Sequence, residues 1–274
     1  MALWRSSNQH NLPDSSPDEN IAASQQTPRV ALVTGGSRGI GAETVLTLAK
    51  QGYDVVLTYR NKAARAQEVV EAVTQYGQRG LALLCDMTQP DDVERCIQKV
   101  QQWTDHLHAL ILNASGGLER DLVAADPVYP MHINRDAQLA FVGAALPLLV
   151  QGSTITLVTS HWAHLYGQVV QLPAYEPVAA SKYAGEQALL ACQDRFAARG
   201  IRLLIVTGDL IEGTITPKLL ERTAPGFMAQ RRDSQGVLPT VEEMGQEIAL
   251  ASINPALSSG SLVVVGAPLQ SLLS

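Results

Sequence analysis

Short apolar runs and amphipathic segments alternate along the chain from Arg29 onward. The apolar runs are rich in β-branched residues and carry few polar positions, which is typical of strands buried on both faces of a parallel sheet. Between them, apolar residues recur at the three-to-four-residue spacing of helices that cover such a sheet. The pattern predicts seven strands, within residues 29–35, 53–60, 80–87, 107–115, 153–160, 201–209 and 261–267.

The amphipathic segments between these strands predict helices within residues 39–52, 61–77, 89–103, 131–149, 178–199 and 240–252. Buried strands that alternate with helices indicate an α/β fold, here a doubly wound seven-stranded parallel sheet of the Rossmann type. We expect a single domain over residues 29–274, because the sequence shows no internal repeat and no second set of elements.

Residues 209–239 stand apart as a long irregular connection that contains both Pro and Gly. Long loops within a compact domain are usually functional, so we expect this segment to be a substrate lid. The alternative is a plain insertion that covers an edge of the sheet.

The N-terminal segment differs in composition from the rest of the chain. Residues 1–28 are rich in Ser, Asn, Gln, Asp and Pro and lack an apolar period. Such a segment cannot bury enough apolar surface to offset its ordering entropy, so we expect a disordered tail. It also lacks the apolar core of a secretory signal peptide, which favours a cytoplasmic protein.

Charge and cysteine content exclude several other classes of function. The 274-residue chain has a formal net charge of −6 with scattered charges and no basic stripe, so we do not expect nucleic acid as a partner. No apolar run reaches the roughly 18 residues of a membrane span. Cys85, Cys96 and Cys192 are too few and too dispersed for a disulfide framework or a zinc site, and we predict no metal.

A glycine-rich stretch, VTGGSRGIGAE, joins the first predicted strand to the first predicted helix. Small residues let the backbone turn sharply beside a pyrophosphate, and the helix N-terminus offers it N–H groups and a positive dipole. A glycine motif alone is weak evidence, but the strand before it and the helix after it strengthen this one. The loop contacts with a dinucleotide are expected from Gly35, Ser37, Arg38, Gly39, Ile40 and Gly41.

Two arginines favour NADP(H) over NAD(H). An acidic residue after the second strand would accept the ribose hydroxyls of NAD, but Arg60 occupies that position and Arg38 lies in the glycine loop. Two cations near this ribose favour a 2′-phosphate. The alternative is that both arginines are solvated surface residues.

The third and fourth predicted strands also end in candidate cofactor contacts. Asp86 could accept a hydrogen bond from the adenine amino group with the Met87 backbone beside it, or it could cap the following turn. Asn113, Ala114 and Gly116 form a turn of small residues where the ribose would pass.

Several stretches together resemble the short-chain dehydrogenase/reductase family. They are TGGSRGIG, NASG, HINRDAQLAFVGAALPLL, TITLVTS and AASKYAGEQAL, and they extend over nearly the whole chain after the first 28 residues. The chain is most similar to the acyl-carrier-protein ketoreductase-like branch. The resemblance implies hydride transfer between a nicotinamide and a carbonyl or alcohol carbon.

The resemblance also assigns catalytic roles. It implies that Lys182 binds the nicotinamide ribose and lowers the pKa of the catalytic tyrosine, that Ser160 holds the substrate oxygen, and that Asn134 anchors a water of the proton relay. It also makes Thr214 the threonine that touches the nicotinamide amide or the phosphates. The tyrosine itself is missing, because Val178 stands four residues before Lys182.

Three interpretations of the missing tyrosine follow. In the first, Tyr175 replaces it from the entrance of the active-site helix, seven residues or about two helical turns before Lys182. In the second, a histidine, another tyrosine or a water supplies the proton, with candidates His161, His164 and Tyr166. In the third, the protein binds NADP(H) without redox chemistry.

Residues around the predicted lid give further candidates. Asp209 and Glu212 could act as acids if they face the pocket, or they could be solvated or capping carboxylates. Apolar and aromatic side chains near the lid indicate an apolar or aromatic ketone, unless they serve only packing: Trp162, Tyr166, Leu172, Phe227 and Met228.

The sequence therefore predicts an NADPH-dependent reductase of a ketone, with Tyr175, Ser160, Lys182 and Asn134 as catalytic residues. The first alternative is a non-catalytic NADP(H)-binding regulator or scaffold. The second is a lyase or isomerase that uses the same pocket without net redox chemistry. The resemblance implies a homodimer or homotetramer, because family members associate through the two apolar helices expected within residues 131–149 and 178–199.

Overall fold

A computed structural model describes residues 27–273 and contains a seven-stranded sheet with the order β3-β2-β1-β4-β5-β6-β7. All neighbouring strands are parallel. The prediction of a doubly wound α/β fold is thereby confirmed. The strands are β1 Arg29–Val33, β2 Tyr53–Tyr59, β3 Gly80–Leu84, β4 Leu107–Leu112, β5 Leu149–Ser160, β6 Arg202–Gly208 and β7 Leu262–Val265.

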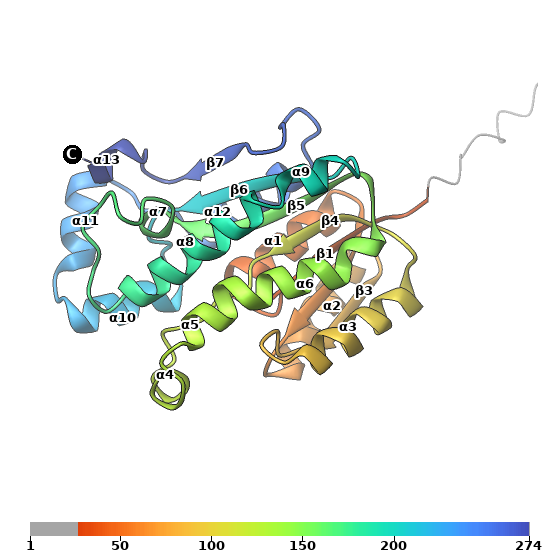
Figure 1. The fold of residues 1–274 in the computed structure, drawn as a ribbon, viewed down its shortest axis with the longest axis horizontal. Helices are drawn as coiled ribbons and strands as arrows, with labels where there is room; N and C mark the ends of the chain where they lie inside the picture. Colours follow the sequence, from red (N-terminus) through yellow and green to blue (C-terminus); the bar gives the residue numbers. More distant parts are fainter. Residues whose placement is uncertain (1–26, 274) are drawn as a thin grey trace, which may run out of the picture.

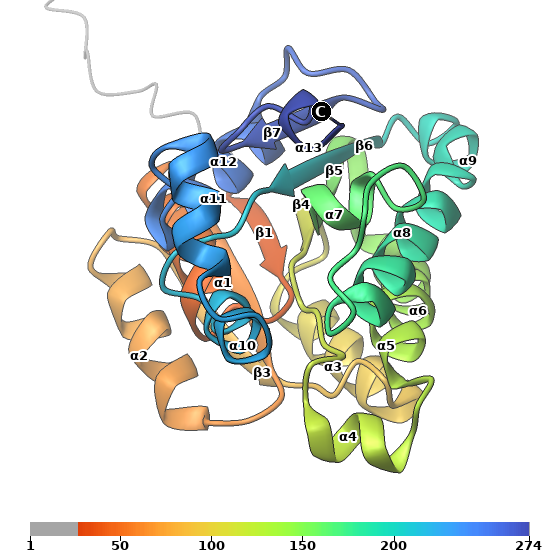
Figure 2. The same cartoon turned by 90° about the vertical axis from the view of Figure 1, so that its left-hand side faces the viewer.

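Helices cover both faces of the sheet, as Figure 2 shows with the strands between two helical layers. Successive side chains of a strand point to opposite faces of the sheet. In β1, Val30 and Leu32 therefore join one apolar core, and Ala31 and Val33 join the other. One layer holds α1 Gly39–Lys50, α2 Ala63–Thr74 and α12 Val241–Ile253. The other holds α3 Pro90–Trp103, α6 Ala137–Ala145, α8 Glu176–Leu190 and α9 Gln193–Ala197.

The helix predicted within residues 131–149 is present as one continuous helical run, but its hydrogen-bonding pattern changes along its length. It divides into α5 Tyr129–Met131, a π-helical turn η1 His132–Asp136, α6 and a 3₁₀ turn η2 Leu146–Leu148. Pro147 lies in η2, where the missing N–H of proline favours the end of a helix. Strand β5 then begins at Leu149, four residues before its predicted start.

The lid segment is more regular than the sequence indicated. It contains α10 Ile215–Thr223 and α11 Phe227–Gln235, separated at Gly226, whose φ of +86° suits glycine. Figure 1 shows both helices beyond the carboxyl ends of the strands. A third apolar cluster joins this segment to the chain after β5 through Trp162, Leu220 and Met228.

Three short helices complete the described chain: α4 Arg120–Ala125, α7 His161–His164 and α13 Gln270–Leu273. None of the helices within residues 27–273 is long and apolar enough to cross a membrane. The predicted disordered tail lies outside the described residues, except for Thr27 and Pro28.

Candidate active site

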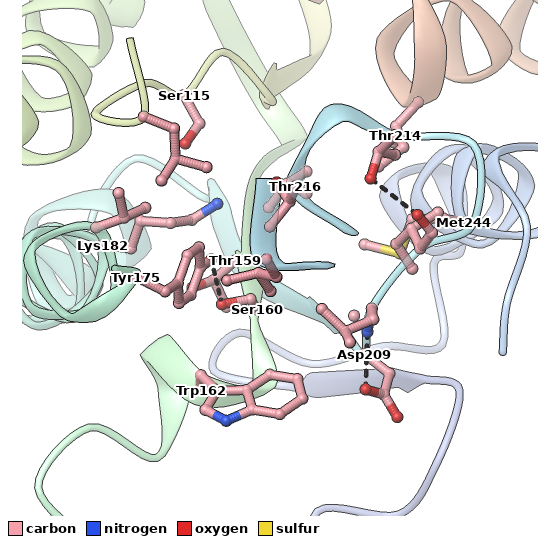
Figure 3. A pocket seen from close by; sticks show the side chains of 18 of the residues that line it. Ser115, Thr159, Ser160, Trp162, Tyr175, Lys182, Asp209, Thr214, Thr216 and Met244 are labelled. Atoms are coloured by element: carbon pink, nitrogen blue, oxygen red, sulfur yellow. Dashed lines mark hydrogen bonds between the residues drawn. The ribbon is translucent and has the colours of Figure 1, made fainter. Parts of the chain in front are cut away.

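A cavity of about 330 Å³ opens at the carboxyl end of the sheet. This is where ligands bind in open α/β sheets, at the point where the strand order reverses between β1 and β4. Side chains from the α1 entrance, the loop after β4, the end of β5, helix α8 and the chain after β6 line it (Figure 3). The chain segments that the sequence assigned to the cofactor, the proton donor and the lid therefore meet at one cavity.

The glycine loop has the tight geometry that a pyrophosphate site requires. Gly35 and Gly39 adopt φ values of +66° and +54°, in the left-handed region that favours glycine. A Cβ on Gly41 would lie 2.3 Å from the carbonyl oxygen of Gly35, so no larger residue fits there without a backbone shift. The loop leads directly into the N-terminus of α1. The free N–H groups and positive dipole of a helix N-terminus fit a dinucleotide phosphate.

Asn113 holds this loop in place. Its Nδ2 donates to the carbonyl oxygens of Thr34 and Gly35, at 3.0 and 3.2 Å. The hydroxyl oxygen of Thr34 accepts hydrogen bonds from the backbone N–H groups of Asn113 and Ala114, both at 3.0 Å. The sequence analysis did not identify Thr34. Its role in joining the loop after β1 to the loop after β4 becomes visible only when these two strands are seen to pair.

The other predicted adenosine contacts have intramolecular partners. Arg60 donates to Tyr129 Oη at 2.6 Å and to Glu119 Oε1 at 3.4 Å. Asp86 Oδ1 accepts from the N–H and the hydroxyl of Thr88, at 3.0 and 2.7 Å, which is the turn cap considered as the alternative. The Met87 side chain is buried in the apolar core.

Tyr175, Ser160 and Lys182 converge on the cavity. Tyr175 Oη and Ser160 Oγ are hydrogen-bonded at 2.9 Å, and all three side chains line the cavity. Tyr175 is the N-cap residue of α8, and Figure 3 shows it projecting from the same helix as Lys182. Ser160 is positioned by β5 and caps α7, accepting a hydrogen bond from Ala163 N at 3.2 Å.

Burial shifts the pKa values of both titratable groups in this trio. Desolvation lowers the pKa of Lys182 to about 8, and the carboxylate of Glu186, one turn further along α8, partly opposes the shift. Desolvation raises the pKa of the Tyr175 phenol, and the hydrogen bond with Ser160 opposes that shift. The phenol therefore keeps its proton at neutral pH.

Asn134 ties the loop after β4 to the active-site helix. Its Nδ2 donates to Gly116 O at 2.9 Å and to Ser181 Oγ at 3.0 Å, and its Oδ1 accepts from Ser115 Oγ at 2.9 Å. It lies within the π-helical turn η1 and is buried. The side chain is thus a structural bridge between two walls of the site.

A second, small cavity of about 10 Å³ lies beside Lys182. Gln138 Oε1 and Thr159 Oγ1, both from residues that line it, are buried without a hydrogen-bond partner within the described part of the chain. Gln138 follows Asn134 by one helical turn and was missed from the sequence, where it resembles any polar residue of a helix.

Comparison with known proteins adds to this geometry. The sequence matches the short chain dehydrogenase family profile over residues 29–223, which is more than half of the chain. The chain belongs to the short-chain dehydrogenase family. The resemblance found in the sequence is therefore confirmed.

Named relatives include reductases. A hydroxynaphthalene reductase-like protein of Metarhizium anisopliae is 33% identical over 61% of this chain and 64% of its own length, so the match covers slightly less than two thirds of that relative. The 1-cyclohexenylcarbonyl-CoA reductase of Streptomyces collinus is 30% identical over 72% of this chain and 69% of its own length. A short chain dehydrogenase of Burkholderia cenocepacia, solved in complex with NADP, has a TM-score of 0.74 and 26% identity, covering 88% of this chain and 98% of that one.

Val178, four residues before Lys182, is buried and lines the cavity. Tyr175 lies three residues earlier, close to one helical turn, and so comes from nearly the same face of the helix. This displacement brings its hydroxyl to Ser160.

The other predicted proton donors do not line the cavity. His161 is fully buried and bonded to Thr207 Oγ1 and Ala267 O, at 3.0 and 2.9 Å, and burial lowers its pKa. His164 Nδ1 pairs with Glu186 Oε1 at 2.7 Å, and this hydrogen bond raises its pKa. The ring of Tyr166 packs near that of Tyr183. Of the four side-chain candidates, only Tyr175 is in the cavity.

One wall of the cavity is apolar. It is lined by Trp162, Leu172, Leu210 and Leu220, which belong to the third apolar cluster together with Phe227, Met228 and Tyr166. Thr214 also lines the cavity and donates its hydroxyl to Ile211 O at 2.8 Å.

Both predicted lid acids are ion-paired. Asp209 lines the cavity but accepts hydrogen bonds from Arg231 at 2.8 and 3.2 Å, in a pair that is buried on both sides. Glu212 pairs with Arg232 on an exposed part of the lid. Arginine side chains of the lid therefore engage both carboxylates.

Proposed function

We propose that this chain is an NADPH-dependent oxidoreductase that interconverts a ketone and a secondary alcohol, with Tyr175 as its proton donor. The observation that carries the proposal is the 2.9 Å hydrogen bond between Tyr175 Oη and Ser160 Oγ, in the cavity that Lys182 also lines. A phenol, a hydroxyl and a buried amine converging on one apolar cavity suit protonation of a substrate oxygen.

Bound NADP(H) would supply or accept the hydride. The loop from Gly35 to Gly41 and the N-terminus of α1 would hold its pyrophosphate. Arg38 and Arg60 would face a 2′-phosphate, and Lys182 would bind the nicotinamide ribose. The fold likeness to an NADP-complexed short chain dehydrogenase supports this choice of cofactor.

The protein's own groups would manage the proton. Tyr175 keeps its proton because burial raises the pKa of its phenol, so it can give that proton to a substrate oxygen during reduction. Ser160 would position the same oxygen through its hydroxyl. The ammonium form of Lys182 would stabilise the tyrosinate that remains, since an adjacent cation favours a charged phenolate.

The lining of the cavity supports a neutral, apolar ketone. Trp162, Leu172, Leu210 and Leu220 form an apolar wall, and the carboxylate of Asp209 in that wall is neutralised by Arg231. A charged substrate group placed against this wall would lose hydration without gaining a partner in it. The relative named as a hydroxynaphthalene reductase-like protein supports a cyclic substrate.

We also infer that residues 29–274 form the NADP(H)-binding reductase domain and that residues 209–239 act as its substrate lid. The apolar contacts between the lid and Trp162 support this role. We propose that the protein is cytoplasmic and forms a homodimer or homotetramer.

Val178 favours a second candidate, a protein that binds NADP(H) without turnover, because the family tyrosine is absent from its usual position. The decisive experiment measures NADPH binding and NADPH oxidation separately, with a panel of aryl and alicyclic ketones. Tyr175→Phe should lower the turnover rate by about 10²–10⁴-fold, as expected for a lost general acid, and leave NADPH binding unchanged. Tyr166→Phe removes a hydroxyl outside the cavity and should have no such effect.

Three outcomes would contradict the proposal. Full activity of Tyr175→Phe would assign the proton to another donor. Tight NADPH binding by the wild type without turnover of any ketone would favour the non-catalytic protein. Consumption of a substrate with the cofactor unchanged would indicate a lyase or isomerase.

A further inference from the structure

We propose that Glu119 is a specificity residue of the cofactor site, which weakens the preference for a 2′-phosphate by competing for the guanidinium of Arg60. The proposal rests on the proposed use of NADP(H), and it assigns a role to a residue that no family motif includes. It depends on three side chains that meet across the end of β1: Arg60, Glu119 and Tyr129.

The sheet order explains why their contact lies over the cofactor site. Arg60 follows β2, whereas Glu119 and Tyr129 follow β4, and β1 lies between these two strands. A contact between them therefore crosses the carboxyl end of β1, where the glycine loop begins. In a doubly wound sheet the pyrophosphate of a dinucleotide lies at this loop and its adenosine ribose lies beside it, at the end of β2 where Arg60 follows the strand.

Glu119 is fixed in this position rather than being a mobile surface group. Its Oε2 accepts hydrogen bonds from the backbone N–H groups of Gly117 and Leu118, at 2.7 and 3.1 Å. Its Oε1 then faces Arg60 at 3.4 Å, and the residue lines the main cavity. The loop thus presents a carboxylate to the arginine that would bind the phosphate.

The loop is shaped to let both partners of Arg60 approach. A Cβ on Gly116 would lie 3.1 Å from Tyr129 Oη and 3.3 Å from Glu119 Oε1, so glycine leaves room for the two side chains. Burial opposes the charge of Arg60, but Tyr129, Glu119 and Asp86 together raise its pKa. These neighbours stabilise the cation in the absence of a cofactor.

The consequence for cofactor choice follows from charge. When a 2′-phosphate binds, either Arg60 must leave Glu119 or the phosphate must lie beside the negatively charged carboxylate of Glu119. Both alternatives weaken the binding of NADPH. NADH carries a 2′-hydroxyl in place of the phosphate and meets much less repulsion. The two arginines favour NADPH over NADH, and Glu119 makes this preference smaller by weakening the binding of NADPH.

The test measures the Kd values of NADPH and NADH from nicotinamide fluorescence, without any ketone. Glu119→Gln keeps an oxygen that can accept from Gly117 and Leu118 but removes the charge. We expect the Kd of NADPH to fall by about three- to fivefold, the effect of one partly exposed charge pair, and the Kd of NADH to change by less than about twofold. Glu94→Gln makes the same change of net charge at an exposed position on α3 and should alter neither Kd.

A double-mutant cycle tests whether the effect passes through Arg60. In an Arg60→Gln background, Glu119→Gln should no longer tighten NADPH selectively, because the two groups act as a coupled pair. A persisting selective effect would overturn the proposal, as would equal tightening of both cofactors by the single variant. Selective weakening of NADH would also overturn it, since Glu119 would then bind the 2′-hydroxyl.

Failure of this inference is distinguishable from failure of the proposed function. If the wild type binds NADPH and Glu119→Gln leaves the ratio of the two Kd values unchanged, only the role of Glu119 is lost. If the wild type binds neither cofactor, both proposals are overturned together.

Discussion

The two halves of the site are held together by different forces. In the cofactor half, the loop after β1 is fixed by glycine geometry and by the neutral hydrogen bonds of Asn113 and Thr34. The other half, which we call the proton half, consists of α7, α8 and the lid. Its polar side chains are buried or partly buried titratable groups, namely Lys182, Glu186, His161, His164 and the Asp209–Arg231 pair. Changes of pH should therefore disturb proton transfer before they disturb cofactor binding.

The largest expected effect comes from breaking the Asp209–Arg231 pair. Arg231→Met would leave the buried carboxylate of Asp209 without its cation, which should lower the free energy of unfolding by about 3–5 kcal/mol. Chemical denaturation of the apoprotein measures this. The double variant Asp209→Leu with Arg231→Met removes both charges and should recover most of the loss. If the single variant is as stable as wild type, the lid is not anchored by charge, and the comparison between the two halves fails.

The next effect is the pH dependence that Lys182 confers. Its pKa is lowered to about 8 in the folded protein, so between pH 8 and 10.5 the unfolded chain binds more protons than the folded one. Stability relative to a Lys182→Met variant should therefore rise across this interval, by about 3 kcal/mol at 1.4 kcal/mol per pH unit for one proton. In contrast, kcat/KM of the wild type should fall above about pH 8 as the ammonium is lost.

The rise in stability and the fall in kcat/KM with pH can be measured separately. Unfolding by denaturant at pH 7, 8, 9 and 10 gives the stability difference, and a pH profile of kcat/KM gives the titration of the free enzyme. The affinity for NADPH should change less than kcat/KM across the same range. An affinity that fell in parallel would show that Lys182 contributes mainly to cofactor binding.

A smaller effect is expected in the cofactor half. Gly41→Ala would place a Cβ 2.3 Å from Gly35 O, so the backbone must shift, at a cost of about 1–3 kcal/mol in stability. NADPH binding should be lost because the loop no longer fits the pyrophosphate. These losses should be the same at pH 6 and pH 8, since neither Gly41 nor Asn113 titrates. Gly143→Ala is the matched control, because the added Cβ would meet no atom within 4 Å beyond its own chain neighbours and the backbone of its helix.

The same contrast explains how far the sequence could predict the molecule. The strands, the glycine loop and Asn113 follow local patterns, and the observed seven-stranded parallel sheet and loop geometry agree with them. The two lid helices, and the π-helical and 3₁₀ turns in the helix predicted within residues 131–149, depend on proline, glycine and tertiary contacts that a periodic pattern does not reveal.

The candidate site divides in the same way. Lys182 and Ser160 line one cavity, as the family resemblance implied, and Tyr175, the first of the three candidate replacements, lines it too. The partners of charged groups were not foreseen: Arg231 follows Asp209 by 22 residues and Glu119 follows Arg60 by 59. Such pairs depend on how loops cross the end of the sheet, which one sequence does not specify.

The smallest expected effect concerns His164. The hydrogen bond with Glu186 raises the pKa of His164, so the charged pair stabilises the folded protein fully below the unfolded value of about 6.5 and is lost as pH rises through the folded pKa. His164→Gln can still donate to Glu186 but has no charge. It should therefore be destabilised by roughly 1 kcal/mol at pH 5.5 and by less at pH 8.5.

Denaturation of both proteins at these two pH values measures the difference, with His132→Gln as a control on an exposed histidine that pairs with Asp126. If the loss of stability in His164→Gln grew with pH, the charged His164–Glu186 pair would not be the stabilising form, because neutral His164 would then stabilise the protein more. A deficit that shrinks as expected would place a pH-sensitive charge pair in the proton half. The loop after β1, in contrast, is held by the neutral hydrogen bonds of Asn113 and Thr34, which do not titrate in this range.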